Sequence, residues 1–162
     1  YTYKNYGDNT GIEVDTYATR INNNAVYKYT YTYDESGNII QISGNEGSEY
    51  RYVYDDLGQL IREDNSKLNK TYTYTYDNAG NITSKKTYAY TSASSSPSSL
   101  SATYTYGYGD STWGDKLTSY RGVNITYDEL GNPLTYYNGT SYNFTWVRGR
   151  RLSQVTKGVN TK

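Results

Sequence analysis

A short motif, Tyr-Asp-x-x-Gly, recurs along the sequence and restricts what this chain can fold into more than any other feature. Its copies begin at Tyr33, Tyr54, Tyr76 and Tyr127, and the first three are 21 and 22 residues apart. Before each copy, Tyr, Val or Ile alternates with other residues, and an aliphatic residue follows the glycine (Ile39, Leu60, Ile82, Leu134). Self-similarity at such a period is typical of a repeat architecture, in which one supersecondary unit stacks on the next.

Each unit is best interpreted as a β-hairpin. Alternation with period two places the aromatic rings on one face of a strand, and aromatic and β-branched residues favour strands. The step Asp-x-x-Gly is typical of a type I turn, with Asp accepting hydrogen bonds from the turn and Gly supplying the positive φ of a bulge. We therefore assign a structural role in turns to Asp34, Gly37, Asp55, Gly58, Asp77, Gly80, Asp128 and Gly131.

The strand after each turn leaves one question open. A second apolar residue often follows three positions after the first, as Ile42 follows Ile39 and Val155 follows Leu152. An odd spacing puts two side chains on opposite faces of a regular strand, or on one face if a bulge intervenes. The sequence does not decide between these alternatives.

Further copies extend the array over residues 1–162. A terminal variant covers residues 142–152 with Trp146 in the ring position, and two weaker copies lie at residues 6–10 and 108–112. We count about seven units in a single array. The exception is the Ser-rich stretch 92–101, which we interpret as a flexible inserted loop.

These units predict an all-β fold with little or no helix, because apolar residues do not recur at helical spacing. Sequential hairpins form an antiparallel meander, and a sheet of many strands twists and coils. We expect tandem hairpins in one continuous, curved or spiralling sheet. Its free edges favour edge-to-edge self-association.

Composition narrows the possible functions. The chain has 24 Tyr but no His and no Cys, so Ser–His and Cys–His catalysis, disulfides and zinc–thiolate sites are excluded. Its formal net charge is zero, which does not favour a nucleic-acid partner, and no apolar run approaches the ~20 residues of a membrane span. We expect no enzyme activity, no catalytic residue, no metal and no cofactor.

Three sets of side chains have an alternative interpretation. The motif aspartates could bind calcium or act as paired catalytic carboxylates, but a Gly three residues after each one favours turn capping. A basic cluster at residues 148–151 could contact nucleic acid, although a solvated turn or a cation–π contact with Trp146 is favoured. Exposed aromatic rings could stack on sugars, although packing between hairpins is favoured. The candidates for carbohydrate stacking are Tyr52, Tyr74, Tyr106, Trp113 and Trp146.

The four motif copies resemble the YD repeats of the RHS family, which includes bacterial wall-associated and RHS toxins, shell components of Tc toxins, and teneurins. The matching stretches are residues 33–39, 54–60, 76–82 and 127–133. The resemblance implies a secreted or bacterial cell-surface protein. In some relatives the β-strip spirals into a hollow shell (here a partial YD shell) around a toxic or unfolded C-terminal segment, and in others it forms an adhesive rod.

The chain also departs from the fuller family pattern. It has only Pro97 and Pro133, and no Pro- and Asp-rich cleavage segment, so self-cleavage and a toxin cargo are not encoded in it. The expected function is a non-enzymatic scaffold, a segment of a larger secreted or cell-surface bacterial protein that builds either a β-shell around a C-terminal toxin or other cargo, or a stalk. Its expected partner is the remainder of its own polypeptide, namely further repeats and, in the shell alternative, a C-terminal toxin. The alternative is a carbohydrate-binding or adhesion module that uses exposed Tyr and Trp rings to bind cell-surface glycans.

Overall fold

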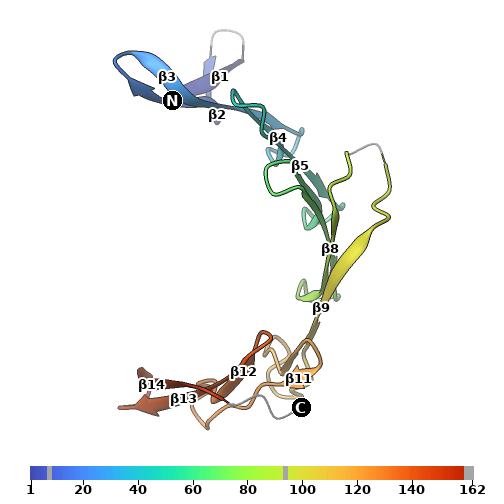
Figure 1. The fold of residues 1–162 in the computed structure, drawn as a ribbon, viewed down its shortest axis with the longest axis vertical. Helices are drawn as coiled ribbons and strands as arrows, with labels where there is room; N and C mark the ends of the chain where they lie inside the picture. Colours follow the sequence, from blue (N-terminus) through green and yellow to red (C-terminus); the bar gives the residue numbers. More distant parts are fainter. Residues whose placement is uncertain (7–8, 93–94, 159–162) are drawn as a thin grey trace. The chain divides into compact units, whose positions relative to one another are not determined.

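A computed structural model describes residues 1–6, 9–92 and 95–158, which form β-strands and turns without a helix (Figure 1). The first seven strands are β1 (Thr2–Tyr6), β2 (Asn9–Ile21), β3 (Asn24–Tyr33), β4 (Ile39–Gly44), β5 (Glu49–Tyr54), β6 (Leu60–Asn65) and β7 (Lys70–Tyr76). The others are β8 (Ile82–Ala89), β9 (Leu100–Gly107), β10 (Ser119–Tyr120), β11 (Val123–Asn124), β12 (Thr135–Tyr137), β13 (Ser141–Val147) and β14 (Arg151–Lys157).

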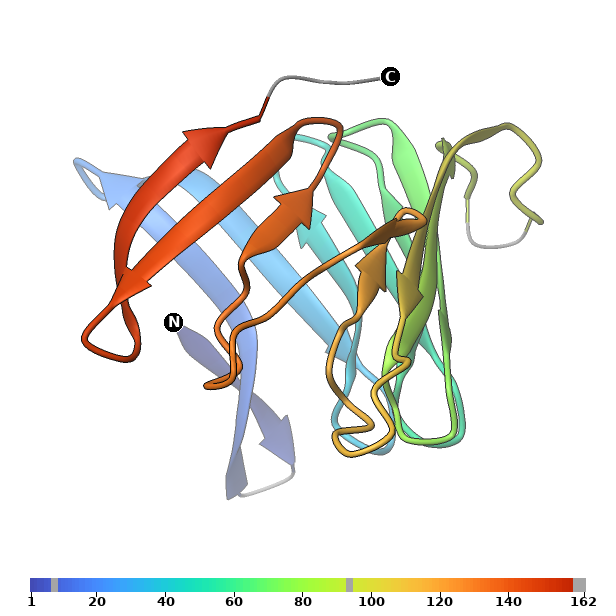
Figure 2. The ribbon, with the colours of Figure 1, turned by 90° about the horizontal axis from the view of Figure 1, so that it is seen from below.

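Hydrogen bonding follows the order of the chain. Strands β1 to β11 form an eleven-stranded sheet in sequence order, and β12, β13 and β14 form a second sheet of three strands (Figure 2, orange to red). The prediction of an all-β fold of antiparallel hairpins is confirmed. By compactness the chain divides into a first unit, Tyr1–Tyr74 with Lys86–Ala102, and a second unit, Thr75–Lys85 with Thr103–Lys162. The count of seven repeats in one array stays a prediction.

The turns at the four motifs share one hydrogen-bonding pattern. In the turn after β7, Asp77 Oδ1 accepts hydrogen bonds from the amides of Ala79 and Asn81, both at 2.9 Å. The Gly80 amide donates to the Asp77 carbonyl at 3.1 Å, and Gly80 has a φ of 87°. Because L-residues with a Cβ rarely adopt this backbone conformation, the turn favours glycine at this position. The equivalent bonds occur at Asp34, Asp55 and Asp128.

A β-bulge follows the turns at Asp34 and Asp55 and also the turn between β13 and β14, and it answers the question left open by the sequence. Tyr33 pairs with Ile39, whereas Thr32 pairs with Gln41, so one residue of β4 is left over. The same shift occurs between Val53 and Tyr54 and between Thr145 and Trp146. The extra residue returns the second apolar side chain to the face of the first. Ile39 and Ile42 therefore lie on the face that also carries Tyr33 and Tyr31.

Little of the chain is buried. Among the described residues, Ile125 is the one apolar side chain that is buried, with 8% of its surface exposed. The motif strands instead carry half-buried tyrosine rings. The described residues contain no helix long and apolar enough to cross a membrane. Stability therefore rests on cross-strand contacts and hydrogen bonds rather than on a thick apolar core.

Two sequence features fall partly outside the described residues. The weak copy at residues 6–10 includes residues 7 and 8, and the Ser-rich stretch 92–101 includes residues 93 and 94. Strand β9 begins at Leu100, inside the range predicted as a loop. The flexibility of this stretch stays a prediction.

Candidate binding surface and the contacts that join the hairpins

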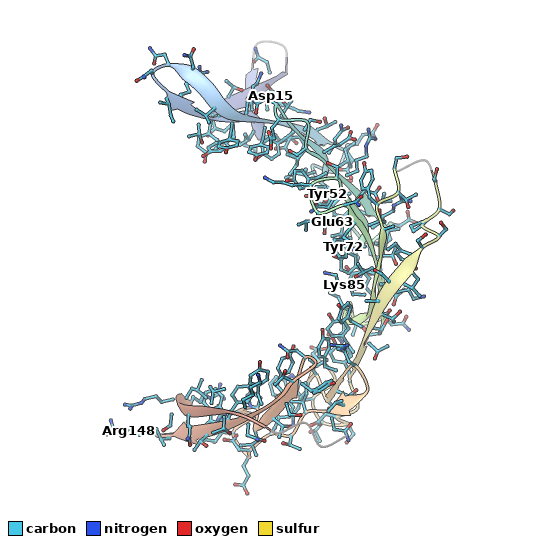
Figure 3. The ribbon with its side chains drawn as sticks, viewed as in Figure 1. Asp15, Tyr52, Glu63, Tyr72, Lys85 and Arg148 are labelled. Carbon is cyan, nitrogen blue, oxygen red and sulfur yellow. The ribbon has the colours of Figure 1, made fainter. Side chains whose placement is uncertain are left out.

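Aromatic side chains gather on one face of the sheet in the first unit. Strand register aligns Tyr31 with Ile42 and Tyr50, and two residues further along β5 it aligns Tyr52 with Glu63 and Tyr72. Residues two apart on a strand share a face, so these six side chains lie on the same side. Figure 3 shows Tyr52, Glu63 and Tyr72 there. We call this set the tyrosine face.

A shallow hollow lies on the tyrosine face. It has a volume of about 240 Å³ and is lined by Tyr29, Tyr31, Ile42, Tyr50 and Tyr52. Burial raises the pKa of the Tyr52 hydroxyl, and the nearby Glu63 carboxylate raises it further, so this phenol stays protonated at neutral pH. The hollow can therefore offer ring faces for apolar contact and hydroxyl groups for hydrogen bonding.

Rings also stack in rows in the second unit. Tyr120 lies between Tyr104 and Tyr136, with ring centroids 6.3 and 5.7 Å apart and interplanar angles of 10° and 13°. Tyr106 packs against Tyr120 at 5.1 Å with a tilted ring. The Arg121 guanidinium lies 5.2 Å from the centre of the Tyr104 ring. Side chains from β9, β10 and β12 thus form a continuous aromatic row.

The motif ring of one hairpin is tied to the backbone of the preceding hairpin. The Tyr54 hydroxyl donates to the Ile39 carbonyl at 2.9 Å, and the Trp146 indole N–H donates to the Pro133 carbonyl at 2.7 Å. Tyr33, Tyr108 and Tyr127 donate in the same way to the carbonyls of Val14, Ile82 and Leu117. Ile39 and Pro133 are themselves the cross-strand partners of the preceding motif rings, Tyr33 and Tyr127. The ring-to-carbonyl tie therefore recurs at an equivalent place.

A polar network occupies the opposite face of the first unit. Asp64 is 1% exposed, and its Oδ1 accepts hydrogen bonds from Arg62 Nε at 2.9 Å and from the Thr71 hydroxyl at 2.8 Å. The Arg62 guanidinium also donates to the backbone carbonyls of Ser92 and Ser95 in the Ser-rich stretch and of the preceding Thr91, over 2.9–3.2 Å. Arg62 thus holds the described part of this insertion against the sheet.

Comparisons with known proteins identify the repeats. A family model described as RHS Repeat matches residues 33–69 and 54–93, which cover β4 to β8 and their turns. Residues 33–93 of the chain carry RHS repeats. The resemblance of the Tyr-Asp-x-x-Gly units to this family is confirmed. No curated protein matches the chain.

The solved structures that match this chain are of much longer chains. The Photorhabdus luminescens Tc holotoxin pore, mutated in TccC3, matches 81% of this chain at 14% identity with a TM-score of 0.46. A crystal structure of TcdB2-TccC3-TEV matches 82% at 14% identity with a TM-score of 0.40. This chain spans 9% of the length of each of those two chains.

The five aromatic residues proposed for carbohydrate stacking are divided between the two units, and their role stays a prediction. In the first unit, Tyr52 lines the hollow, and the half-buried Tyr74 donates to Glu63 Oε2 at 3.4 Å. In the second unit, Tyr106 packs in the aromatic row, Trp146 forms a ring-to-carbonyl tie, and Trp113 is 54% exposed beside Gly131. Among the described residues, no group of three or more acidic side chains is arranged to hold a metal.

Removing a single tie should weaken the RHS array. Tyr54→Phe keeps the ring but leaves the Ile39 carbonyl without this donor, so we expect the free energy of unfolding to fall by about 1 kcal/mol. Urea unfolding followed by tyrosine fluorescence measures the change. Tyr27→Phe is the matched control, because Tyr27 is 50% exposed, and we expect no measurable effect there. Equal stability of Tyr54→Phe and the unaltered chain would argue against the tie.

The turn carboxylates should make the RHS repeats sensitive to acid. Hydrogen bonds from the Asn81 amide and side chain hold the pKa of Asp77 below its usual range, and those from Asn38 and Asn132 do so for Asp34 and Asp128. Their stabilisation is complete above the unfolded pKa of about 3.9 and is lost as pH falls through the lower folded values. We expect the urea concentration at the midpoint of unfolding to stay constant between pH 7 and pH 5 and to decrease when the pH is lowered below 4. Asp77→Asn should reduce that drop.

Proposed function

We propose that this chain is a non-enzymatic structural segment of a longer secreted or cell-surface protein, in which consecutive RHS hairpins build a continuous wall. The recurring ring-to-carbonyl tie is the observation that carries the proposal. Tyr33, Tyr54 and Trp146 each fix their own hairpin to the one before it. Stability then comes from nearest-neighbour junctions, as in other repeat proteins, so hairpins can be added in series.

We propose further that the tyrosine face lines the inside of this wall and contacts an enclosed segment of the same polypeptide. The two faces differ in chemistry. The tyrosine face presents half-buried rings. The opposite face carries a row of polar side chains across four strands, Gln41, Arg51, Asp64 and Thr71. Tyrosine offers a large contact area and a hydroxyl at low entropic cost, which suits contact with an unfolded chain of mixed composition.

Cysteine labelling tests this orientation, because the chain has no native cysteine. Ile42→Cys places a thiol on the tyrosine face, and Val53→Cys places one on the opposite face, where Val53 is 39% exposed. In a cysteine-free form of the full-length protein, a polymer-linked maleimide of several kilodaltons should label position 53 and not position 42. After denaturation both should react. Equal labelling in the native protein, or labelling of position 42 alone, would refute enclosure.

A second candidate function is carbohydrate binding at the tyrosine face. It is favoured by the hollow of about 240 Å³ with its four tyrosines, since ring faces suit sugar stacking. A glycan array followed by calorimetry tests it. Saturable binding that Tyr50→Ala abolishes would support this candidate, and no binding to any immobilised saccharide would remove it. Binding unaffected by Tyr50→Ala would place any sugar elsewhere.

A further inference from the structure

Tyr106 and Tyr120 face each other where β9 pairs with β10. They are direct cross-strand partners, and beside them the Arg121 amide donates to the Thr105 carbonyl at 2.8 Å. A bond in this place flanks a non-hydrogen-bonded pair, the type of antiparallel pair in which opposite side chains approach most closely. The two ring centroids are 5.1 Å apart, and the ring planes are inclined by 50°. The backbone therefore keeps these two phenol rings in contact.

The inclined geometry of this pair differs from that of its neighbours in the aromatic row. Tyr104 and Tyr136 lie nearly parallel to Tyr120, with centroids 6.3 and 5.7 Å away. A bond between two aromatic carbons lies in the plane of each ring, so stacked rings must turn before it can form. The two rings of a biaryl are twisted relative to each other, and the Tyr106–Tyr120 pair is already closer to that arrangement.

Another inclined pair has less backbone support. The Tyr1 and Tyr17 rings lie 5.0 Å apart at 45°. Tyr1 precedes β1 and is 77% exposed, so strand pairing does not hold its ring in place. Tyr106 and Tyr120 both lie within paired strands and are both half-buried. Half-burial hinders contact between the rings of different molecules and favours a reaction within the pair.

Composition directs oxidants to tyrosine in this chain. It has no Cys and no Met, whose sulfur atoms are common targets of oxidation, but it has 24 Tyr. Burial and the neighbouring Tyr120 raise the pKa of Tyr106, which is therefore a neutral phenol at neutral pH. A neutral phenol gives up an electron together with its hydroxyl proton and becomes a phenoxyl radical.

We propose that Tyr106 and Tyr120 are an oxidative cross-linking site, joined as dityrosine by hydrogen peroxide and a haem peroxidase. Each phenol loses one electron and its hydroxyl proton, and the two radicals combine through one Cε carbon of each ring. Each joined carbon then releases its hydrogen as a proton while the phenol oxygen takes up a proton. In total two electrons and two protons leave the pair, and they reduce one hydrogen peroxide to two molecules of water.

The bond reinforces a short join between strands. β10 pairs with β9 at two positions, whereas β5 pairs with β6 at five. A link between the two tyrosines closes a loop around the turn that connects β9 and β10, which restricts the unfolded chain as a disulfide does. The wall proposed above does not require this bond, so failure of the cross-link and failure of the wall can be told apart.

Limited oxidation of the full chain followed by tryptic digestion tests the site. Dilute protein is treated with a haem peroxidase and hydrogen peroxide, and monomers are separated from oligomers before digestion. Trypsin cleaves after Lys and Arg, so Tyr120 is the one tyrosine of peptide 117–121, and Tyr106 lies in peptide 87–116. The expected product in the monomer is these two peptides joined, two hydrogen atoms lighter than their sum, with fragmentation placing the bond at Tyr106.

Two variants separate this pair from its neighbours. Tyr106→Phe keeps the ring but cannot form a phenoxyl radical, so the joined product should be lost. Tyr104→Phe is the matched control, because it removes a phenol that stacks on Tyr120 from the same strand, and the product should remain. Unchanged circular dichroism of both variants reports that the fold is intact.

Three results would overturn the proposal. These are absence of the joined product from oxidised monomers, its persistence in Tyr106→Phe, or a larger amount of peptide 117–121 joined to peptide 122–148, which contains Tyr136. We also expect the linked monomer to unfold at a higher urea concentration than the untreated monomer. Equal midpoints would refute reinforcement of the join.

Discussion

Replacing Arg62 with alanine is expected to lower the free energy of unfolding by about 3 kcal/mol, because it leaves the buried Asp64 carboxylate without its ion-pair partner. The Arg62 side chain is 14% exposed and Asp64 is 1% exposed, so water cannot replace the lost contact easily. Asp64 already has one buried oxygen, Oδ2, with no partner among the described residues. Urea unfolding of the Arg62→Ala chain measures the change.

The same variant should release the Ser-rich insertion. Arg62 donates to the carbonyls of Thr91, Ser92 and Ser95, so its loss should speed limited proteolysis in this stretch. Arg51→Ala is the matched control, because the Arg51–Glu49 pair is 40% and 32% exposed and contributes at most about 0.5 kcal/mol. Similar losses for the two variants would show that burial of the Arg62–Asp64 pair is unimportant.

Ile125→Ala should have the second-largest effect, a loss of about 2 kcal/mol in the free energy of unfolding. Ile125 is 8% exposed, and its amide donates to the Thr118 carbonyl at 2.9 Å, so the backbone around the new cavity is held in place. In a fold with half-buried rings, few other side chains can expand into that cavity. Chemical unfolding followed by circular dichroism measures the loss.

Val123→Ala provides the comparison from the same hairpin. Val123 is 40% exposed, and truncating an exposed side chain typically changes stability by less than about 0.5 kcal/mol. A loss at position 125 no greater than that at position 123 would mean that the second unit does not depend on this buried contact.

Local patterns predicted much of this fold. Period-two alternation identified the strand faces, and the Asp-x-x-Gly step identified the turns, since both depend on residues close in sequence. The sequence left open whether a bulge follows the turn. The spacing of Ile39 and Ile42 is compatible with a regular strand that places them on opposite faces and with a bulged strand that places them on one face, until the partner strand is known. Only the pairing of Tyr33 and Tyr31 with these two residues resolves it.

Contacts between distant residues were not predictable in this way. Nothing near Arg62 in the sequence indicates that its guanidinium meets carbonyls about 30 residues later, because a backbone acceptor has no signature of its own. The ring-to-carbonyl tie was missed for the same reason. Tyr108 is instructive, since its motif is only a weak copy, yet its hydroxyl contacts the Ile82 carbonyl as the stronger copies contact theirs.

The spacing of 21 and then 22 residues between motifs has a consequence for how such arrays change over time. Ile42 pairs with Tyr50 and the equivalent Glu63 pairs with Tyr72, so the extra residue is absorbed in the link between strands and the register is unaltered. Insertions and deletions confined to these links leave every ring on its own side. Selection can therefore tolerate changes in link length while removing single-residue insertions and deletions within strands, which would move the side chains of a strand to the opposite face.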